Sequence, residues 1–262
     1  MLNPIFLADL DDTLFQTLRK MEPLPDDKEY RSGALDRSLK PRSFMTKEQG
    51  MFTDWLLANS ELIPVTARGT EEISRVTIPF KSWAITTHGA VILRPDKTPD
   101  PEWKSKIIHA LSAYTQAIYD LQTLCTQLLA DRGVNGWARI NFEYDEQPIY
   151  LVMKHRDSTK IQEIYDVADE VATKFDLSGF YVHRNSNNIA WLPKCIEKGI
   201  ATEYLLSILR EKDGVRPVIG LGDSLSDYKF LQHCSWWGVP KKSQFASHIN
   251  LSLNHEIKST DI

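Results

Sequence analysis

Short apolar runs alternate with longer amphipathic segments over both ends of the chain. The runs are of a length typical of buried strands and predict strands at residues 4–10, 62–65, 83–85, 90–93, 216–221 and 236–239. The amphipathic segments predict helices at residues 46–59, 70–76, 198–210 and 226–232. Strands that alternate with helices favour a parallel sheet covered by helices, so we expect an α/β fold.

The segment 46–59 carries the clearest helix signal. Thr46 and Gln49 have the spacing of a capping box, which satisfies free backbone groups at a helix start. We expect the core-facing stripe of this helix to be formed by Met51, Phe52, Trp55 and Leu56.

The middle of the chain has a different rhythm. A long helical pattern at 102–129 precedes two expected strands, and a second helix at 159–175 precedes two more. The expected strands lie at residues 137–144, 148–154, 179–184 and 188–192. This α-β-β-α-β-β order predicts an inserted α+β unit, in which two helices cover one face of a four-stranded antiparallel sheet. By strand alternation, Ile140, Phe142 and Tyr144 should pack under the helices.

Composition narrows the function classes. The chain has 262 residues, 42% of them hydrophobic and 25% charged, which is ordinary for a globular protein. A net charge of −4 gives no argument for binding to nucleic acid or to an anionic membrane. The three cysteines form no C-x-x-C pair, which argues against structural zinc and favours a reducing compartment. With no secretion signal and no membrane-length apolar stretch, we expect a cytoplasmic protein; its oligomeric state is left open.

Carboxylates follow two of the expected strands. Asp9 and Asp11 follow the apolar run 5–8 at the end of the first strand, and Asp223 and Asp227 come after the strand at 216–221. Parallel strands place their chemistry at their carboxyl ends, where paired aspartates can divide nucleophile and proton-transfer duties. A third aspartate can complete a site for Mg²⁺. Each motif alone is also typical of an ordinary acidic turn.

Two further residues complete the set. Thr66 follows the strand at 62–65, a position where threonine is often only a helix cap. Lys198 begins a predicted helix, where a positive charge opposes the helix dipole unless an anion or a carboxylate lies nearby.

Taken together, Asp-x-Asp-x-Thr, Thr66, Lys198 and Gly-Asp-x-x-x-Asp resemble the motif series of the haloacid-dehalogenase-like (HAD) phosphatases. Residues 85–92 and 189–193 are similar to the segments that enter and leave the cap of members whose cap follows the third strand. The short cap resembles that of the sugar-phosphate phosphatases, which include sucrose-phosphate, trehalose-phosphate and mannosyl-phosphoglycerate phosphatases. The resemblance implies a Rossmann-like catalytic core at 1–88 and 194–262, and a specificity cap at 89–193.

The resemblance also implies roles. Asp9 would attack phosphorus, and Asp11 would protonate the leaving alkoxide and then activate water. Mg²⁺ would be held by Asp9, the Asp11 carbonyl and Asp223. Thr66 and Lys198 would bind the phosphoryl oxygens, assisted by the loop N–H groups near Leu10 and Asp11. Asp227 would either pair with Lys198 or support the metal from behind, and Ser226 would hold a metal-bound water.

Three positions depart from the family pattern. Asp12 stands where glycine is usual, Ser226 where asparagine is frequent and His88 where asparagine is common. None of these changes removes a group that the implied mechanism needs, so we expect activity.

Substrate choice should lie with the free face of the cap sheet and with residues beside the phosphate site. The candidates are Arg68, His88, Arg139, Asn141, Lys154, Tyr181 and His183. Trp191, beside the cap exit, could line a sugar pocket. The polar segment 20–42 is too poor in apolar residues for a core element, and its Arg31, Arg37, Lys40 and Arg42 could meet an acidic substrate. It is either a lid, a specificity loop or a surface loop.

The sequence therefore predicts a Mg²⁺-dependent phosphomonoesterase that acts on a phosphorylated sugar or a similar small metabolite. A phosphomutase or phosphotransferase of the same fold is a poorer match, and a hydrolytic dehalogenase is poorer still. A phosphate-ester-binding or regulatory module without turnover is the alternative from another class. Retention of all six motif residues argues against that alternative.

Overall fold

A computed structural model describes residues 2–21, 30–185 and 188–260, with the side chains of 254–260 excepted. Part of the segment 20–42 and residues 186–187 lie outside these ranges. The chain divides into two compact units, Met1–Asp100 with Glu197–Ile262, and Pro101–Ile196. Residues 89–100, which the expected insertion included, belong to the first unit. Among the described residues, no helix combines the length and apolar character needed to cross a membrane.

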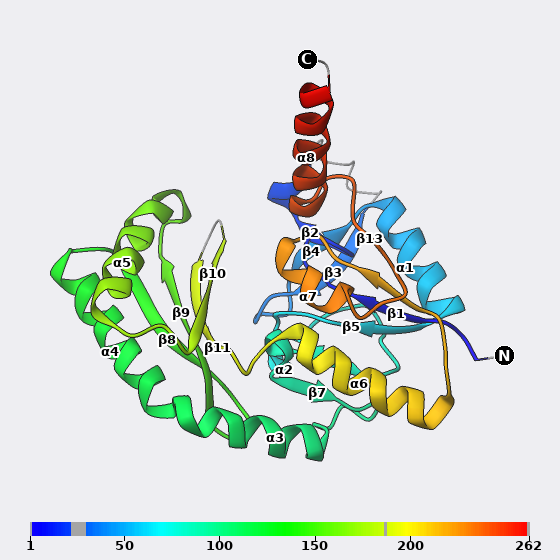
Figure 1. Ribbon diagram of the computed structural model, residues 1–262, viewed down its shortest axis with the longest axis horizontal. Helices are drawn as coiled ribbons and strands as arrows, with labels where there is room; N and C mark the ends of the chain where they lie inside the picture. Colours follow the sequence, from blue (N-terminus) through cyan, green and yellow to red (C-terminus); the bar gives the residue numbers. More distant parts are fainter. Residues whose placement is uncertain (1, 22–29, 186–187, 261–262) are drawn as a thin grey trace. The chain divides into compact units, whose positions relative to one another are not determined.

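The first unit is built on a parallel sheet, as the α/β prediction required (Figure 1). Its strands are β1 (Ile5–Ala8), β5 (Glu61–Pro64), β12 (Val218–Leu221) and β13 (Trp236–Gly238), in the order β13-β12-β1-β5. A bridge from Val65 to Ile85 adds β6 (Ala84–Thr86) beside β5. β7 (Val91–Leu93) turns back to pair antiparallel with β6, which explains why residues 89–100 stay with this unit.

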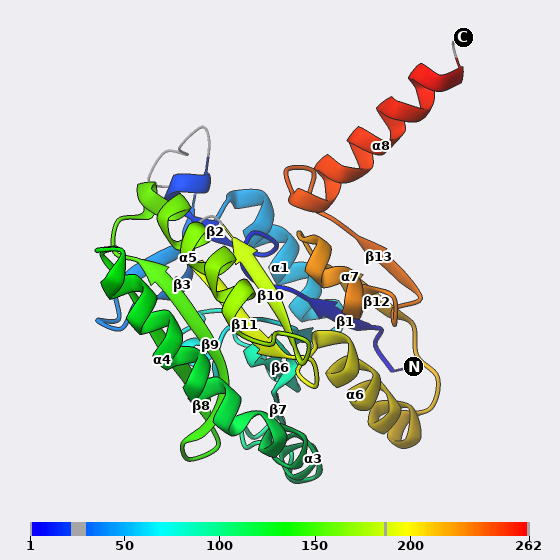
Figure 2. The same ribbon diagram turned by 60° about the vertical axis from the view of Figure 1, so that its left-hand side comes forward.

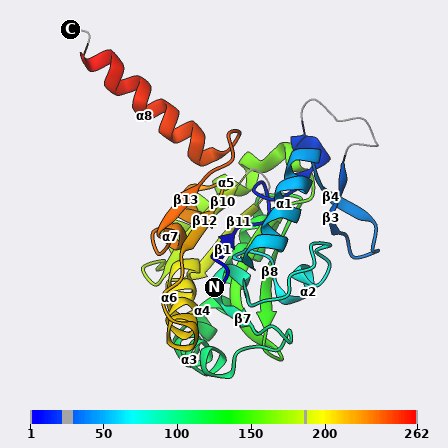
Figure 3. The same ribbon diagram turned by 90° about the vertical axis from the view of Figure 1, so that its right-hand side faces the viewer.

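Helices cover both faces of this sheet. The helices of this unit are α1 (Lys47–Asn59), α2 (Thr70–Ile73), α6 (Lys198–Asp213), α7 (Tyr228–Leu231) and α8 (Gln244–Thr260), of which α8 projects away from the sheet (Figure 3). Figure 3 shows α1 on one side of β1, and α6 with α7 on the other. Phe6 and Ala8 share a buried cluster with Leu56 of α1, while Leu7 points to the opposite face and is also buried. Residues of both parities in β1 are therefore apolar, as a sheet covered on both faces requires.

The predicted capping box of α1 is confirmed, but the predicted core stripe is wrong except at Leu56. Gln49 N donates to Thr46 Oγ1 at 3.2 Å, and Thr46 N donates to Gln49 Oε1 at 2.9 Å. Met51, Phe52 and Trp55 are 67%, 42% and 53% exposed. The buried residues of the helix are Gly50, Thr53 and Leu56. Small residues form most of the contact face, so the largest apolar side chains do not mark it.

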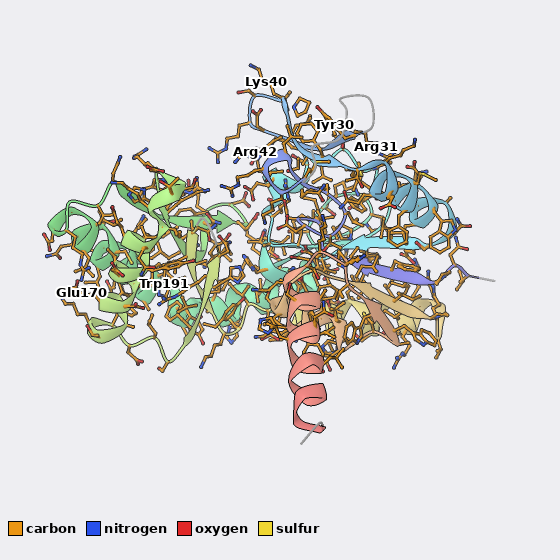
Figure 4. All side chains as sticks on the ribbon, turned by 90° about the horizontal axis from the view of Figure 1, so that it is seen from above. Tyr30, Arg31, Lys40, Arg42, Glu170 and Trp191 are labelled. Carbon is orange, nitrogen blue, oxygen red and sulfur yellow. The ribbon has the colours of Figure 1, made fainter. Side chains whose placement is uncertain are left out.

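The segment 20–42 contributes to the core, contrary to expectation. β3 (Arg31–Leu35) and β4 (Pro41–Met45) form an antiparallel sheet with β2 (Gln16–Thr17), in the order β2-β4-β3. Ala34 and Met45 belong to the buried cluster beneath α1. Gly33 lies so close to Phe15 that a Cβ would come within 2.6 Å of the Phe15 Cβ. Lys40 and Arg42, labelled in Figure 4, are exposed on this hairpin.

The second unit has the predicted α-β-β-α-β-β order. Its antiparallel sheet has the order β10-β11-β9-β8 and consists of β8 (Gly136–Glu143), β9 (Gln147–His155), β10 (Phe180–Asn185) and β11 (Asn188–Pro193). The helices α4 (Thr115–Asp131) and α5 (Ile161–Lys174) cover one face of it (Figure 2). A 3₁₀ turn at Ser112–Tyr114 divides the expected first helix into α3 (Pro101–Leu111) and α4.

Two predictions for side chains of the second unit are wrong. Ile140 packs into the core as expected, but a β-bulge between Asn141 and Phe142 interrupts the alternation and leaves Phe142 exposed. Trp191 is fully buried in the core between the sheet and its helices, so it cannot line a pocket (Figure 4).

Candidate active site

The two acidic motifs meet because β1 and β12 are parallel neighbours. Ala8 pairs with Leu221 at the carboxyl ends of these strands, and Asp9 N donates to Leu221 O at 2.9 Å. One carboxylate oxygen from each of Asp9, Asp223 and Asp227 lies within 4.8 Å of the others. The sequence motifs thus converge at the edge of the sheet where an α/β protein places its chemistry.

Lys198 is buried between two of these carboxylates. It is the first residue of α6, and its Nζ lies 2.7 Å from Asp9 Oδ1 and 2.7 Å from Asp227 Oδ1. Burial opposes its charge, but the attraction of Asp227 and Asp9 outweighs burial and raises the pKa of Lys198. The two carboxylates explain why a lysine occupies a helix start, where the dipole disfavours it.

Both carboxylate oxygens of Asp227 accept hydrogen bonds from protein donors. Its Oδ1 accepts from Lys198, and its Oδ2 accepts from Asp223 N, Ser224 N and Ser224 Oγ at 3.2, 3.0 and 2.8 Å. Burial opposes ionisation, but Lys198 and the Ser224 hydrogen bonds lower the pKa of Asp227. Asp227 therefore anchors Lys198 and the loop that carries Asp223, and leaves the other two carboxylates to bind a cation.

Gly222 makes this anchoring possible. A Cβ at residue 222 would lie 2.7 Å from the Asp227 Cβ, closer than real Cβ atoms approach. Gly222 belongs to the Gly-Asp-x-x-x-Asp motif, but no structural role was predicted for it, and no role was predicted for Ser224. The spacing from Ser224 to Asp227 is that of a capping box, and this signal could have identified the serine.

Asp9 and Asp223 have the electrostatics of a cation site. Burial raises the pKa of Asp9 well above its ordinary value, and repulsion from Asp227 and Asp223 adds to the effect against the attraction of Lys198. Burial and repulsion from Asp227 and Asp12 raise the pKa of Asp223 to about 7. A divalent cation would relieve this repulsion, and carboxylate oxygens are the donors that Mg²⁺ prefers, so the residues fit the predicted metal.

Asp11 lies beside this cluster and is held by Arg68. Arg68 Nε donates to Asp11 Oδ2 at 2.7 Å, and Arg68 Nη2 donates to Asp11 Oδ1 at 2.8 Å. The guanidinium also lies over the Phe15 ring, 5.0 Å from its centroid. Arg68 was predicted to be a substrate-specificity residue, and in the structure its guanidinium forms an ion pair with the Asp11 carboxylate.

The predicted phosphate-binding groups lie on neighbouring loops of the same unit. Thr66 is buried after β5, and its Oγ1 accepts from Arg68 N at 3.1 Å. Leu10 has a buried side chain, and its carbonyl accepts from Leu14 N at 3.0 Å in a tight loop. His88 N donates to Thr66 O at 3.1 Å, which links the β6–β7 turn to this loop.

The three departures from the family pattern have local explanations. Asp12 has φ 67° and His88 has φ 57°, a region that glycine and asparagine adopt most easily. Asp12 forms an ion pair with Lys20, a residue that sequence reasoning did not connect to the site. Ser226 is exposed, and its Oγ lies 2.8 Å from Ser224 Oγ.

The remaining specificity candidates lie in the second unit. Val152 pairs with Arg139 and with Ala190, and Ala190 pairs with His183. By the same registers and strand alternation, these positions share one face of the sheet, opposite the helices. The candidates on this face are Arg139, Asn141, Lys154, Tyr181 and His183.

Solved structures of similar fold include sugar-phosphate phosphatases. Sucrose-phosphatase from Synechocystis sp. PCC6803, in complex with sucrose and phosphate, is 16% identical with a TM-score of 0.53, over 97% of this chain and 98% of that chain. The C-terminal domain of C. albicans trehalose-6-phosphate phosphatase is 16% identical with a TM-score of 0.53, over 87% and 72%. A haloacid dehalogenase-like hydrolase from Bacteroides thetaiotaomicron is 11% identical with a TM-score of 0.50, over 90% and 94%. No family model and no curated protein matches the sequence.

Proposed function

Since the chain has the haloacid-dehalogenase-like fold, with a Rossmann-like parallel core, we propose that it is a Mg²⁺-dependent phosphomonoester hydrolase. The observation that carries this proposal is the buried Lys198 ammonium between Asp9 and Asp227, with Asp223 beside them. The carboxylates of Asp9 and Asp223, at the ends of adjacent parallel strands, and the Lys198 ammonium beside them can bind a cation and a phosphate ester together.

In the first step Asp9 attacks phosphorus. A bond forms between an Asp9 carboxylate oxygen and phosphorus, the bond from phosphorus to the ester oxygen breaks, and Asp11 gives a proton to the departing alkoxide. Thr66 and Lys198 bind the phosphoryl oxygens, and the N–H groups of the loop near Leu10 assist. In the second step Asp11 takes a proton from water, which attacks phosphorus and releases Asp9 and inorganic phosphate.

Asp9, Asp223 and the Asp11 carbonyl would hold Mg²⁺. The bound ion would lower the repulsion between the anionic nucleophile and an anionic phosphate ester. Asp227 supports this arrangement from behind, because both of its oxygens are committed to Lys198 and to the Asp223 loop.

The substrate in this proposal is a phosphorylated sugar or a similar small metabolite. The face of the second unit's sheet opposite the helices supports it, because Arg139, Asn141 and His183 on this face provide donors and acceptors for hydroxyl groups. This unit would act as the specificity cap. A cytoplasmic location is part of the proposal and suits the three cysteines, which are free thiols.

Hydrolysis of p-nitrophenyl phosphate tests the chemistry. We expect turnover with Mg²⁺, its loss with EDTA, and its loss in the Asp9→Asn variant, which keeps the shape of the side chain and removes the nucleophile. Turnover by Asp9→Asn at the wild-type rate would rule out the covalent mechanism. A panel of sugar phosphates, phosphoglycerate derivatives and nucleotides then identifies the substrate class.

A further inference from the structure

We propose that Arg68 is a positioning residue, which orients Asp11 for proton transfer and does not act by contacting the substrate. The inference rests on the proposed function, because it assigns Asp11 the acid/base role. Its basis is the paired contact of Arg68 Nε and Nη2 with both oxygens of Asp11.

Arg68 is itself held in place from several directions. Its backbone N donates to Thr66 Oγ1 at 3.1 Å, and its carbonyl accepts from Thr87 N at 2.7 Å. Phe15 supports the guanidinium from below. The Arg68 side chain is 17% exposed, whereas the Asp11 side chain is 48% exposed. A fixed arginine therefore holds a more exposed aspartate, so the arginine sets the position of the pair.

Stability gives a weak reason for this ion pair. Ion pairs with a half-exposed partner add little to the free energy of unfolding, since solvent screens the charges. Orientation gives a stronger reason. Asp11 must reach the leaving oxygen in the first step and a water in the second, and a half-exposed aspartate would otherwise rotate among several rotamers. A planar guanidinium that binds both carboxylate oxygens restricts the Asp11 side chain to one of these rotamers.

The contact leaves Asp11 able to transfer a proton. Each carboxylate oxygen has two lone pairs, and the guanidinium engages one on each oxygen. The remaining lone pairs point away from Arg68 and are available to the leaving oxygen or to water. The same geometry predicts that a lysine at position 68 cannot replace the arginine, because an ammonium does not bind both oxygens in one plane.

The test uses two phosphate esters whose leaving groups differ in whether they must be protonated as they depart. The p-nitrophenolate group leaves without a proton, whereas an alkoxide from an alkyl phosphate needs one. In Arg68→Ala we expect formation of the aspartyl-phosphate from p-nitrophenyl phosphate to stay close to wild type, while its hydrolysis slows about 10- to 100-fold. Rapid mixing should then show a burst of one p-nitrophenolate per active site. Turnover of the alkyl ester should fall further, and added guanidinium should partly restore it.

Arg75→Ala is the matched control. Arg75 binds both oxygens of Glu71 within the same unit, at 2.9 Å each, so its loss reproduces the removal of a paired arginine away from Asp11. We expect Arg75→Ala to change the turnover of either ester by less than about twofold. Arg68→Lys should show the same kinetic defects as Arg68→Ala.

The outcomes separate the inference from the proposed function. No turnover by the wild-type enzyme on any ester would remove the proposed function itself. With an active wild type, a higher KM for both esters, equal losses of kcat and no burst would assign Arg68 to substrate binding and overturn the inference. Wild-type kinetics in Arg68→Ala, or full activity in Arg68→Lys, would overturn it as well.

Discussion

Asp223→Asn should stabilise the metal-free protein above neutral pH and abolish its stabilisation by Mg²⁺. Burial, together with repulsion from Asp227 and Asp12, raises the pKa of Asp223 from 3.8 to about 7 in the folded chain. The ionised carboxylate thus destabilises the fold in the absence of a cation. Asparagine keeps the shape of the side chain and removes the charge.

The sign and size of the effect follow from proton linkage. Between pH 4 and 7 the folded chain holds a proton on Asp223 that the unfolded chain has lost, so the contribution of this residue to stability falls as pH rises through that window. A rise in pKa from 3.8 to about 7 corresponds to about 4 kcal/mol at most. Relative to wild type, we expect the free energy of unfolding of Asp223→Asn to be about 2–4 kcal/mol higher at pH 8 in EDTA, and nearly unchanged at pH 4.

Urea unfolding at pH 4 and pH 8, with EDTA or with saturating Mg²⁺, measures both effects. At a Mg²⁺ concentration 100 times the Kd, the free energy of unfolding of the wild type should rise by about 2.7 kcal/mol, whereas that of Asp223→Asn should rise little. Asp145→Asn is the control, because the Asp145 side chain is almost fully exposed in the second unit. Equal unfolding midpoints for wild type and Asp223→Asn at pH 8 in EDTA would refute this reasoning, as would a full Mg²⁺ response in the variant.

Two other substitutions test the supports of the site. Lys198→Met leaves Asp9 and Asp227 buried without a cation and should cost about 3–5 kcal/mol of unfolding free energy at pH 8, measured in urea with EDTA; an unchanged midpoint would contradict the buried ion pair. Gly222→Ala forces the new Cβ against Asp227 and should lower kcat at least about 10-fold. Gly238→Ala, where a Cβ would have only an ordinary contact at 3.7 Å with Leu221, should keep wild-type kcat; equal losses in the two variants would mean that the close approach to Asp227 is not the cause.

Local signals were sufficient to predict the strands of the parallel sheet, because apolar residues fill both faces of β1 and β5. Local signals failed where the structure of a helix or strand depends on the segment that packs against it. The hairpin of β3 and β4 depends on pairing with β2 and on the fit of Gly33 against Phe15. α1 buries Gly50 and Thr53 in place of its aromatic residues, and Gly50 lies against the Arg31 side chain of β3, a contact that the hydropathy of the helix does not indicate.

α8 is a different kind of omission, because its signal was present. Phe245, Ile249 and Leu253 recur at helical spacing. The structure shows what fixes the start of this helix, since the Phe245 ring lies 5.3 Å from that of Trp237 and 6.2 Å from that of Tyr228. Figure 1 shows α8 extending away from the sheet of the first unit.

The positions of the candidate catalytic groups could be predicted from motifs, whereas their partners could not. Asp9 and Asp223 follow strands whose order a parallel sheet constrains. The pair of Arg68 with Asp11 joins residues 57 positions apart through two loops. Its existence depends on how the loop after β1 and the loop after β5 are folded, and hydropathy carries no information about that.

The charges around the site favour a dication at Asp223 in particular. The two motifs contribute five aspartates: Asp9, Asp11, Asp12, Asp223 and Asp227. Lys198 forms ion pairs with Asp9 and Asp227, Arg68 forms one with Asp11, and Lys20 forms one with Asp12. Three cations against five carboxylates leave two negative charges, and within the described part of the chain Asp223 forms no ion pair. Burial, together with repulsion from Asp227 and Asp12, raises the pKa of Asp223. One divalent ion held by Asp9 and Asp223 would neutralise the two negative charges before an anionic phosphate ester enters.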